Sequence, residues 1–308
     1  MGGDSWCDNV RDRACHALTR KQYAFEVRMN DNGHKLLVIK DLRVVFNLGR
    51  PTAHCALNGA SLSIGDGEVV GLVGESGSGK TVMAHSILGL LPTTGTITGG
   101  RIRWQGTDLL ALPESEMRHI RGGEIAMIFQ DPQASLNPVY PVGQQIEWTL
   151  KRHRGLRVNA AKAEVLGLFE AVQLRDPERC YQSYPHELSG GMCQRIMIAM
   201  AISGHPKLLI ADEPTSALDV SVAAEIVGLL ANLRKTFGLS ILMITHDLSV
   251  ATRLADRIAV LDQGGIVEDV LSGRFLLQSE HAASRKLIDA SRFLGAVLYA
   301  EPQGRQYL

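Results

Sequence analysis

The octapeptide GESGSGKT at residues 74–81 has the residue types and spacing that most directly predict chemistry. It matches the pattern G-x-x-x-x-G-K-[ST], follows the apolar run EVVGLV and precedes a helical pattern, which is the context that a phosphate-binding loop requires. Its glycines allow consecutive backbone N–H groups to surround a phosphate chain. We therefore expect Lys80 to bridge the β- and γ-phosphates and the Thr81 hydroxyl to bind Mg²⁺. A glycine-rich turn that matches by chance is the alternative, and the strand–loop–helix context argues against it.

Two carboxylates, Asp212 and Glu213, end the apolar run in LLIADEPTSALD. Buried strands rarely end in two acids without a cation to bind or a chemical task. We expect Asp212 to bind Mg²⁺ directly or through a water molecule, and Glu213 to polarise an attacking water as general base. An acidic junction between a strand and a turn would explain the pair alone, but it is a weaker explanation beside a phosphate loop.

Two further polar side chains follow apolar runs of the same kind. His246 follows ILMIT, and Gln130 ends IAMIFQ. Open α/β sheets bind ligands at the carboxyl ends of their strands, so His246 is predicted to lie near the γ-phosphate and Gln130 to reach Mg²⁺ or the water. A lone histidine after a strand is usually structural, and its parallel placement with Lys80 and Glu213 favours the functional interpretation.

A second candidate anion site is YPHELSGGMCQR, in which Ser189, Gly190 and Gly191 precede an apolar run. Serine and glycine at a helix start leave backbone N–H groups facing an anion. The apolar run MCQRIMIAMAI, which contains Cys193, is expected to be an ordinary buried helix face. The open question is why one chain would carry two phosphate sites.

Composition limits the classes of function. The 308 residues include 32 Lys and Arg against 32 Asp and Glu, so bulk charge does not favour a nucleic-acid partner. Five scattered cysteines without a CxxC pair indicate reduced thiols. No apolar run approaches a membrane span, and the N-terminus lacks the apolar core of a signal peptide. We expect a soluble intracellular chain that can still dock on a membrane protein.

Strand and helix patterns alternate from Leu36 onward. KLLVIKDLRVVF, EIAMIFQ, KLLIADEP and SILMITHD are typical of strands, GGRIRWQGTDLL of a hairpin, and VAAEIVGLLANLRKTF of a helix. A helix is predicted from Lys80 to about Leu91, where Pro92 would stop it. The alternation predicts an α/β core with a largely parallel sheet. Residues 1–35 are predicted to be poorly ordered, with Met29 as a second possible start.

Taken in order, GESGSGKT, FQDP, LSGGMCQR, IADEPTSALD and ITHD resemble the nucleotide-binding subunit of an ATP-binding cassette (ABC) transporter. The resemblance implies a P-loop NTPase fold of the ABC cassette type, with a RecA-like, mostly parallel sheet core, an antiparallel β subdomain and a helical lobe. It places the ATP-binding domain at residues 36–270, the lobe at about 131–195 and a C-terminal extension at 271–308.

The resemblance also implies roles for single residues: Gln130 in the Q-loop, residues 216–219 as the D-loop, His246 as the switch histidine and Phe46 as the aromatic that stacks on adenine. The residues expected to contact ATP are Phe46, Gly74, Glu75, Ser76, Gly77, Ser78, Gly79, Lys80, Thr81, Ser189, Gly190, Gly191 and Asp219. Those expected near Mg²⁺ are Thr81, Gln130 and Asp212, and the catalytic set is Glu213, His246 and Gln130.

The resemblance answers the question of two phosphate sites. In this family the serine–glycine signature closes over the γ-phosphate held by a partner subunit, in a head-to-tail sandwich with two ATP molecules. The helix dipole and the uncharged amides suit that task. A contact made only to the γ-phosphate distinguishes ATP from ADP, which lets hydrolysis loosen the dimer. The partner cassette is expected to be either identical or a similar separate subunit.

Finer features narrow the family. The chain offers no fused membrane domain, tandem cassette or long coiled-coil insertion, and IFQDPQASLNPVYPVGQQI resembles the peptide and nickel importers. Residues 131–145 either contact a permease coupling helix or simply cover the helical lobe. The tail lacks the Gly-Pro and HPYT runs of many peptide importers, and its H-x-x-S-R-x-L form is nearer to the nickel branch.

We therefore expect the ATP-hydrolysing subunit of an importer for peptides or, alternatively, for nickel or a metal chelate. It would lie on the cytoplasmic face of the inner membrane, bound to two permease subunits and served through them by an extracytoplasmic substrate-binding protein. The alternative of another class is a soluble ABC ATPase that has no role in transport.

Overall fold

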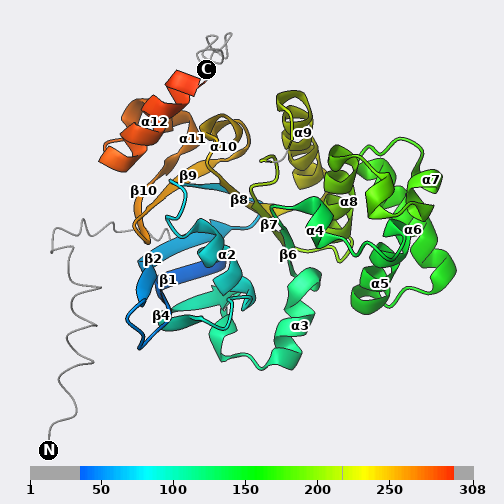
Figure 1. The fold of residues 1–308 in the computed structure, drawn as a ribbon, viewed down its shortest axis with the longest axis horizontal. Coiled ribbons are helices and arrows are strands. Elements are labelled where there is room, and N and C mark those ends of the chain that lie inside the picture. The colour runs from blue at the N-terminus through cyan, green and yellow to red at the C-terminus, as the bar shows by residue number, and fades with distance from the viewer. Residues whose placement is uncertain (1–34, 217, 295–308) are drawn as a thin grey trace, which may run out of the picture.

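The strands predicted to end in polar residues lie together in one six-stranded sheet. The computed structural model describes residues 35–216 and 218–294. The sheet order is β10-β9-β3-β8-β7-β6 (Figure 1). These strands are β3 (Val69–Val73), β6 (Ile125–Ile128), β7 (Leu208–Asp212), β8 (Ser240–Thr245), β9 (Arg257–Asp262) and β10 (Gly265–Leu271). Every pair is parallel except β9 with β10. The predicted largely parallel α/β core is confirmed.

A second sheet is antiparallel, in the order β2-β1-β4-β5. It consists of β1 (Lys35–Phe46), β2 (His54–Gly65), β4 (Gly95–Trp104) and β5 (Thr107–Asp108). The pairing of β4 with β5 confirms the predicted hairpin. Its inner face packs with helix α2 (Lys80–Leu88) in one of the two apolar clusters of the core. This sheet is the antiparallel β subdomain implied by the resemblance.

Helix α2 begins directly after the phosphate loop and is shorter than predicted. It ends at Leu88, because Gly89 adopts a left-handed conformation (φ 60°) that closes the helix before Pro92 can do so. Glycine without a Cβ enters this region at little steric cost, and its N–H donates to the carbonyl of Ser86. The prediction that the helix reaches Leu91 was wrong for this reason.

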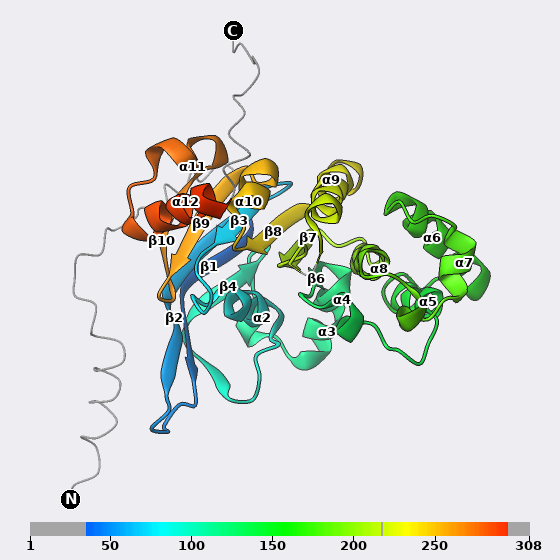
Figure 2. The same cartoon turned by 45° about the horizontal axis from the view of Figure 1, so that its top comes forward.

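The middle of the chain is helical. It runs through the short 3₁₀ turn η1 (Leu109–Ala111), then α3 (Glu114–Gly123), α4 (Pro132–Ser135), α5 (Val142–Arg154), α6 (Val158–Ala171), α7 (Pro177–Gln182), the turn η2 (Pro185–Glu187) and α8 (Gly190–Ile202). Figures 1 and 2 show α5, α6 and α7 gathered at one end of the molecule, with α8 between them and the sheet. Since α8 continues to Ile202, no element boundary falls at residue 195.

The remaining helices return to the sheet. They are α9 (Val220–Phe237), α10 (Leu248–Leu254), α11 (Ser272–Gln278) and α12 (Ala282–Leu294). In the part of the chain that is described, no helix is both long and apolar enough to cross a bilayer. The prediction that residues 1–35 are poorly ordered is wrong for Lys35, which begins β1. The rest of that prediction, and the choice between Met1 and Met29, lie outside the described residues.

Candidate functional site

The phosphate loop between β3 and α2 is pressed between two other strands. A Cβ on Gly74 would lie 2.2 Å from the carbonyl oxygen of Leu261 on β9, and one on Gly79 would lie 2.6 Å from the carbonyl oxygen of Ala56 on β2. Gly79 also has a φ of 108°, which L side chains rarely adopt. No side chain caps α2, so the N–H groups of its first turn remain available to an anion.

Lys80 is held on the loop itself. It is buried, and its Nζ donates to the carbonyl oxygens of Gly74 (2.9 Å) and Glu75 (2.8 Å). Burial lowers the pKa of Lys80, and the nearby carboxylates of Glu213 and Asp212 oppose that effect. The ammonium thus lies over the cradle, and the buried Oγ of Ser78 beside it has no hydrogen-bond partner among the described residues.

Asp212 ends β7 almost completely buried, with 3% of its surface exposed. Burial raises the pKa of Asp212, while a hydrogen bond from Thr81 opposes the rise. Within the described ranges, the Oδ1 atom of Asp212 has no hydrogen-bond partner. An orphaned buried carboxylate oxygen beside a hydroxyl fits a divalent cation. No group of three or more His, Cys, Asp or Glu residues surrounds a metal position in residues 35–216 and 218–294. Magnesium here would therefore take its other ligands from phosphate and water.

The sequence predicted that Glu213 would end the strand, but β7 ends at Asp212 and Glu213 is the first residue after it. Its φ is 46°, a left-handed conformation that is costly for a residue with a Cβ. The backbone is held there because the N–H of Glu213 donates to the carbonyl oxygen of Ile244 on β8 (2.9 Å), while its own carbonyl accepts from Ser216. The turn redirects the Glu213 side chain, which is 18% exposed, toward His246.

His246 follows β8, and its Nδ1 atom lies 3.0 Å from both carboxylate oxygens of Glu213. The structure therefore brings together Lys80, Asp212, Glu213 and His246 at one edge of the sheet, since β3, β7 and β8 are adjacent and parallel. Such an arrangement can bind a phosphate chain and activate a water molecule beside it.

Gln130 does not end a strand. β6 stops at Ile128, and Gln130 lies two residues further on, exposed on the segment that leads to α4. Its side chain forms no hydrogen bond with another described residue. The apolar run continued into Phe129 in the sequence, but that side chain is 40% exposed, so the strand ended sooner than the run of apolar residues suggested.

Phe46 ends β1, opposite His54 on β2 and Gly95 on β4. Its ring centroid lies 5.8 Å from that of His54, with the planes tilted by 57°. A Cβ on Gly95 would lie 3.0 Å from the Phe46 ring, so the ring is fitted against the sheet. His54 was not singled out from the sequence; it meets the Phe46 ring because the register of β1 and β2 places the two residues opposite each other.

Ser189 caps α8 by accepting a hydrogen bond from the N–H of Met192 (3.3 Å). Ser189 and Gly190 are exposed, and nothing lies within 4 Å of a Cβ added to Gly190. The apolar residues of α8 and those of α2 belong to clusters on opposite faces of the sheet. The second candidate anion site is therefore an open helix start, and its helix packs on the opposite face of the sheet from α2, the helix that follows the phosphate loop.

Asp219 caps α9, which begins next to α8. Its Oδ1 accepts hydrogen bonds from Ser221 N (3.1 Å), Val222 N (3.0 Å) and Ser221 Oγ (2.6 Å). The hydrogen bonds from Ser221 and Val222 lower the pKa of Asp219. A Cβ on Gly191 would lie 3.1 Å from the Val222 side chain. Asp219 is thus already engaged as a helix cap, and the serine–glycine stretch lies against the start of the helix it caps.

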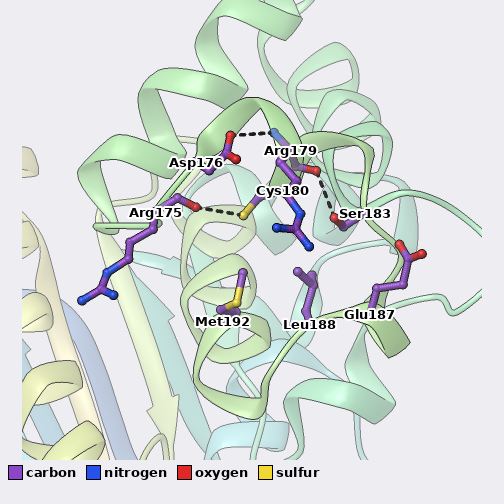
Figure 3. A pocket seen from close by; sticks show the side chains of 8 residues that line it. All are labelled: Arg175, Asp176, Arg179, Cys180, Ser183, Glu187, Leu188 and Met192. Carbon is purple, nitrogen blue, oxygen red and sulfur yellow. Dashed lines mark hydrogen bonds between the residues drawn. The ribbon is translucent and has the colours of Figure 1, made fainter.

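A cavity of about 360 Å³ opens in the helical part of the chain beside the start of α8 (Figure 3). Its lining residues are Arg175, Asp176, Arg179, Cys180, Ser183, Glu187, Leu188 and Met192. The Cys180 thiol donates to the carbonyl oxygen of Arg175 (3.3 Å), and burial raises the pKa of that thiol. The cavity contains no residue predicted for nucleotide chemistry. Opposite charges balance around its apolar floor, and they indicate no particular ligand.

The chain is similar to known proteins over most of its length. The family described as "ABC transporter" matches residues 57–216. The chain is 46% identical over 260 residues to the peptidoglycan transport ATP-binding protein YejF of Agrobacterium fabrum, covering 84% of this chain and 47% of that protein. It thus spans about half the length of that relative. It is 45% identical over 253 residues to the dipeptide transport ATP-binding protein DppD of Haemophilus influenzae, covering 82% of this chain and 76% of the relative.

A solved structure supports the fold. The dimeric, post-hydrolysis ATP-binding cassette MJ0796 bound to ADP and Pi matches with a TM-score of 0.68 at 28% sequence identity. The match covers 77% of this chain and 98% of that one. The β-sheet core, the antiparallel subdomain and the helical part described above are therefore those of a known cassette.

Proposed function

The chain belongs to the ABC transporter family as one of its ATP-binding subunits, and we propose that it hydrolyses ATP to drive the uptake of peptides. The observation that carries this proposal is the pairing of Glu213 with His246 at the sheet edge that also holds Lys80 and Asp212. Identity to a dipeptide transport protein over most of the chain supports the choice of substrate class.

The proposed site binds ATP through the phosphate loop, with Lys80 between the β- and γ-phosphates. Thr81 and Asp212 would hold Mg²⁺, with Gln130 reaching it from the exposed segment after β6. When bound, the ion neutralises charge on the phosphate oxygens. The orphaned Oδ1 of Asp212 supports this assignment, since a buried carboxylate oxygen without a partner is costly.

Hydrolysis in this proposal needs a water molecule in line with the γ-phosphate. Glu213 accepts the proton of that water as it attacks, and His246 fixes the carboxylate in one orientation beside the γ-phosphate. The Glu213 side chain is mostly buried, and its backbone is held in a costly left-handed conformation. Both features support a role in chemistry, because strained backbone conformations cluster at functional sites.

We infer that Ser189, Gly190 and Gly191 act on the ATP of a partner cassette. The open helix start at α8, on the other face of the sheet from α2, supports an action in trans rather than on the same chain's phosphate loop. Asp219 and the D-loop would then lie at the same interface. The partner would be a second copy or a similar separate subunit.

Coupling to transport requires a surface for the permease, and we propose the loop between α4 and α5. The buried side-chain amide of Gln145 braces this loop, donating to the carbonyls of Asn137 and Tyr140. Tyr140 packs edge-on against Trp148 with ring centroids 4.8 Å apart, and Val139 beside them is 68% exposed. An exposed aromatic cluster on a braced loop favours a docking role over simple cover for the lobe.

The full proposed assembly has this chain on the cytoplasmic face of the membrane, with a second cassette, two permease subunits and an extracytoplasmic binding protein. The nickel or metal-chelate alternative rests only on the H-x-x-S-R-x-L form of the tail and gains no support from the relatives. The non-transport alternative predicts no association with membrane proteins.

The test is co-purification from membranes, followed by uptake into vesicles that hold the purified complex. We expect permease subunits to co-purify and a labelled dipeptide, not labelled nickel, to accumulate when ATP is supplied. The same vesicles made with Glu213→Gln should accumulate nothing. Nickel uptake would overturn the substrate class, and the absence of any membrane partner would favour the non-transport alternative.

A further inference from the structure

An ion pair joins the C-terminal extension to the phosphate loop. The Nζ atom of Lys286 on α12 lies 2.6 Å from Oε1 of Glu75, the second residue of the loop. Sequence reasoning placed no residue after His246 in the nucleotide site, because a contact between such distant positions leaves no local pattern. The extension therefore reaches the site through this lysine.

Helix α12 is fixed in place by its other side. Ser284 and Ile288 are buried, and Ala283 and Leu287 pack against the apolar cluster that also contains the buried residues of α8. Figure 2 shows α12 beside β9 and β10. Burial on one face of the helix orients Lys286, on another face, toward the loop.

The turn between β9 and β10 borders the same loop. The N–H of Gly264 donates to the carbonyl oxygen of Ser78 (3.2 Å), and the carbonyl of Leu261 lies against Gly74. The loop is thus bordered by this turn and by α12. The elements C-terminal to His246 consequently help to position the phosphate loop.

The ion pair between Lys286 and Glu75 affects the charge of the phosphate loop. Glu75 brings a carboxylate to a loop that must accept the charges of a triphosphate, and this repels the ligand. Lys286 offsets the charge of Glu75. A hydrogen bond from Lys286 to Glu75, and then the charge of Glu75, raise the pKa of Lys286.

We propose that Lys286 is a nucleotide-positioning residue, which acts by neutralising Glu75 and keeping its carboxylate away from the phosphates. It is a positioning residue because it acts through Glu75 and not on the reacting atoms. The proposal rests on the proposed function only in requiring that the phosphate loop binds ATP. The C-terminal extension thereby becomes part of the nucleotide site.

The experiment is a double-mutant cycle on nucleotide affinity, with MgATP and MgADP titrated into purified full-length protein at low and high salt. We expect Lys286→Ala to weaken MgATP binding about two- to fivefold at low salt, the range of an exposed ion pair. The loss should be smaller for MgADP and should shrink at high salt. Lys286→Arg should retain wild-type affinity.

The cycle is completed in a Glu75→Gln background, where Lys286→Ala should have no further effect on the affinity for MgATP. Arg274→Ala removes an exposed positive charge from the same extension, on α11, and serves as the matched control. It should bind MgATP as the wild type does. Thermal unfolding of each variant reports whether α12 remains docked.

Three results would overturn the proposal: full affinity in Lys286→Ala, an equal loss with and without Glu75, or a loss that is independent of salt and accompanies a lower melting temperature. Failure of the proposed ATP site would give a different result in these titrations. In that case the wild type binds no MgATP, or Lys80→Ala binds it as well as the wild type. A failure in peptide uptake leaves these affinities unaffected.

Discussion

The Nδ1 atom of His246 lies 3.0 Å from each of the two carboxylate oxygens of Glu213. His246 is 62% exposed, so a pair of this kind adds little to the free energy of folding. Its consequence is geometric. Glu213 leaves the strand in a left-handed turn, and the imidazole fixes where the carboxylate points after that turn. Asp212, one residue earlier, is buried next to Thr81 instead.

Glu213→Gln is expected to reduce ATP turnover by at least about 100-fold, because the amide cannot accept the proton of the attacking water. Affinity for MgATP should persist, since Gln has the same shape and leaves the Lys80 contacts in place. Steady-state phosphate release and nucleotide titration measure the two quantities. Glu116→Gln, at an exposed site on α3, is the control and should hydrolyse ATP normally. Unaltered turnover in Glu213→Gln would contradict the assignment of the base.

The sequence was sufficient wherever a local pattern determined position. Parallel strands end at one sheet edge, so the order of the motifs predicted that Lys80, Asp212 and His246 would converge. It was insufficient where backbone conformation decided the outcome. The left-handed turn at Glu213 and the early helix stop at Gly89 depend on single φ angles, which an apolar pattern does not encode.

Contacts between distant parts of the chain were also beyond sequence reasoning. Lys286 meets Glu75 because α12 packs on the core, and His54 meets Phe46 because of the register between β1 and β2. For Gln130 the sequence predicted a feature that the structure does not have. An unbroken apolar run suggested that the strand continued, but strand pairing between β6 and β7 stops at Ile128.

Ser189→Arg should prevent ATP-dependent dimerisation while leaving ATP binding by the same chain intact. The reason is that Ser189 caps an exposed helix start, and α8 packs on the opposite sheet face from α2, so a long cation there obstructs only a partner. Size-exclusion chromatography with MgATP, in the Glu213→Gln background, measures the dimer. Ser189→Ala is the control for the lost cap, which costs about 1 kcal/mol. A loss of ATP affinity as large as that in Lys80→Ala would contradict the action in trans.

Gly74→Ala should disrupt the phosphate loop, because the added Cβ would lie 2.2 Å from the carbonyl oxygen of Leu261, a backbone atom that cannot rotate away. We expect the free energy of unfolding to fall by about 1–3 kcal/mol and the affinity for MgATP to be lost. Urea denaturation and nucleotide titration test the two effects. Gly167→Ala is the matched control, since nothing lies within 4 Å of its added Cβ in α6. Equal behaviour of both variants would mean that the loop adapts.

Tyr181 makes a prediction about alkaline stability. Its hydroxyl donates to the Glu147 carboxylate, and burial, together with that hydrogen bond, raises the pKa of Tyr181 to about 12. A tyrosine in the unfolded chain loses its proton near pH 10. Between about pH 10 and 12 the unfolded state therefore releases a proton that the folded state retains, and the free energy of unfolding falls as the pH rises.

Tyr181→Phe removes this proton, so its free energy of unfolding should fall less steeply than that of the wild type across the same pH range. Urea denaturation at a series of pH values measures the difference in slope. Glu147→Gln should give an intermediate slope, because burial of Tyr181 still raises its pKa when the carboxylate is gone. Parallel slopes for the wild type and Tyr181→Phe would mean that the Tyr181 hydroxyl titrates alike in both states, and that its contact with Glu147 does not persist in solution.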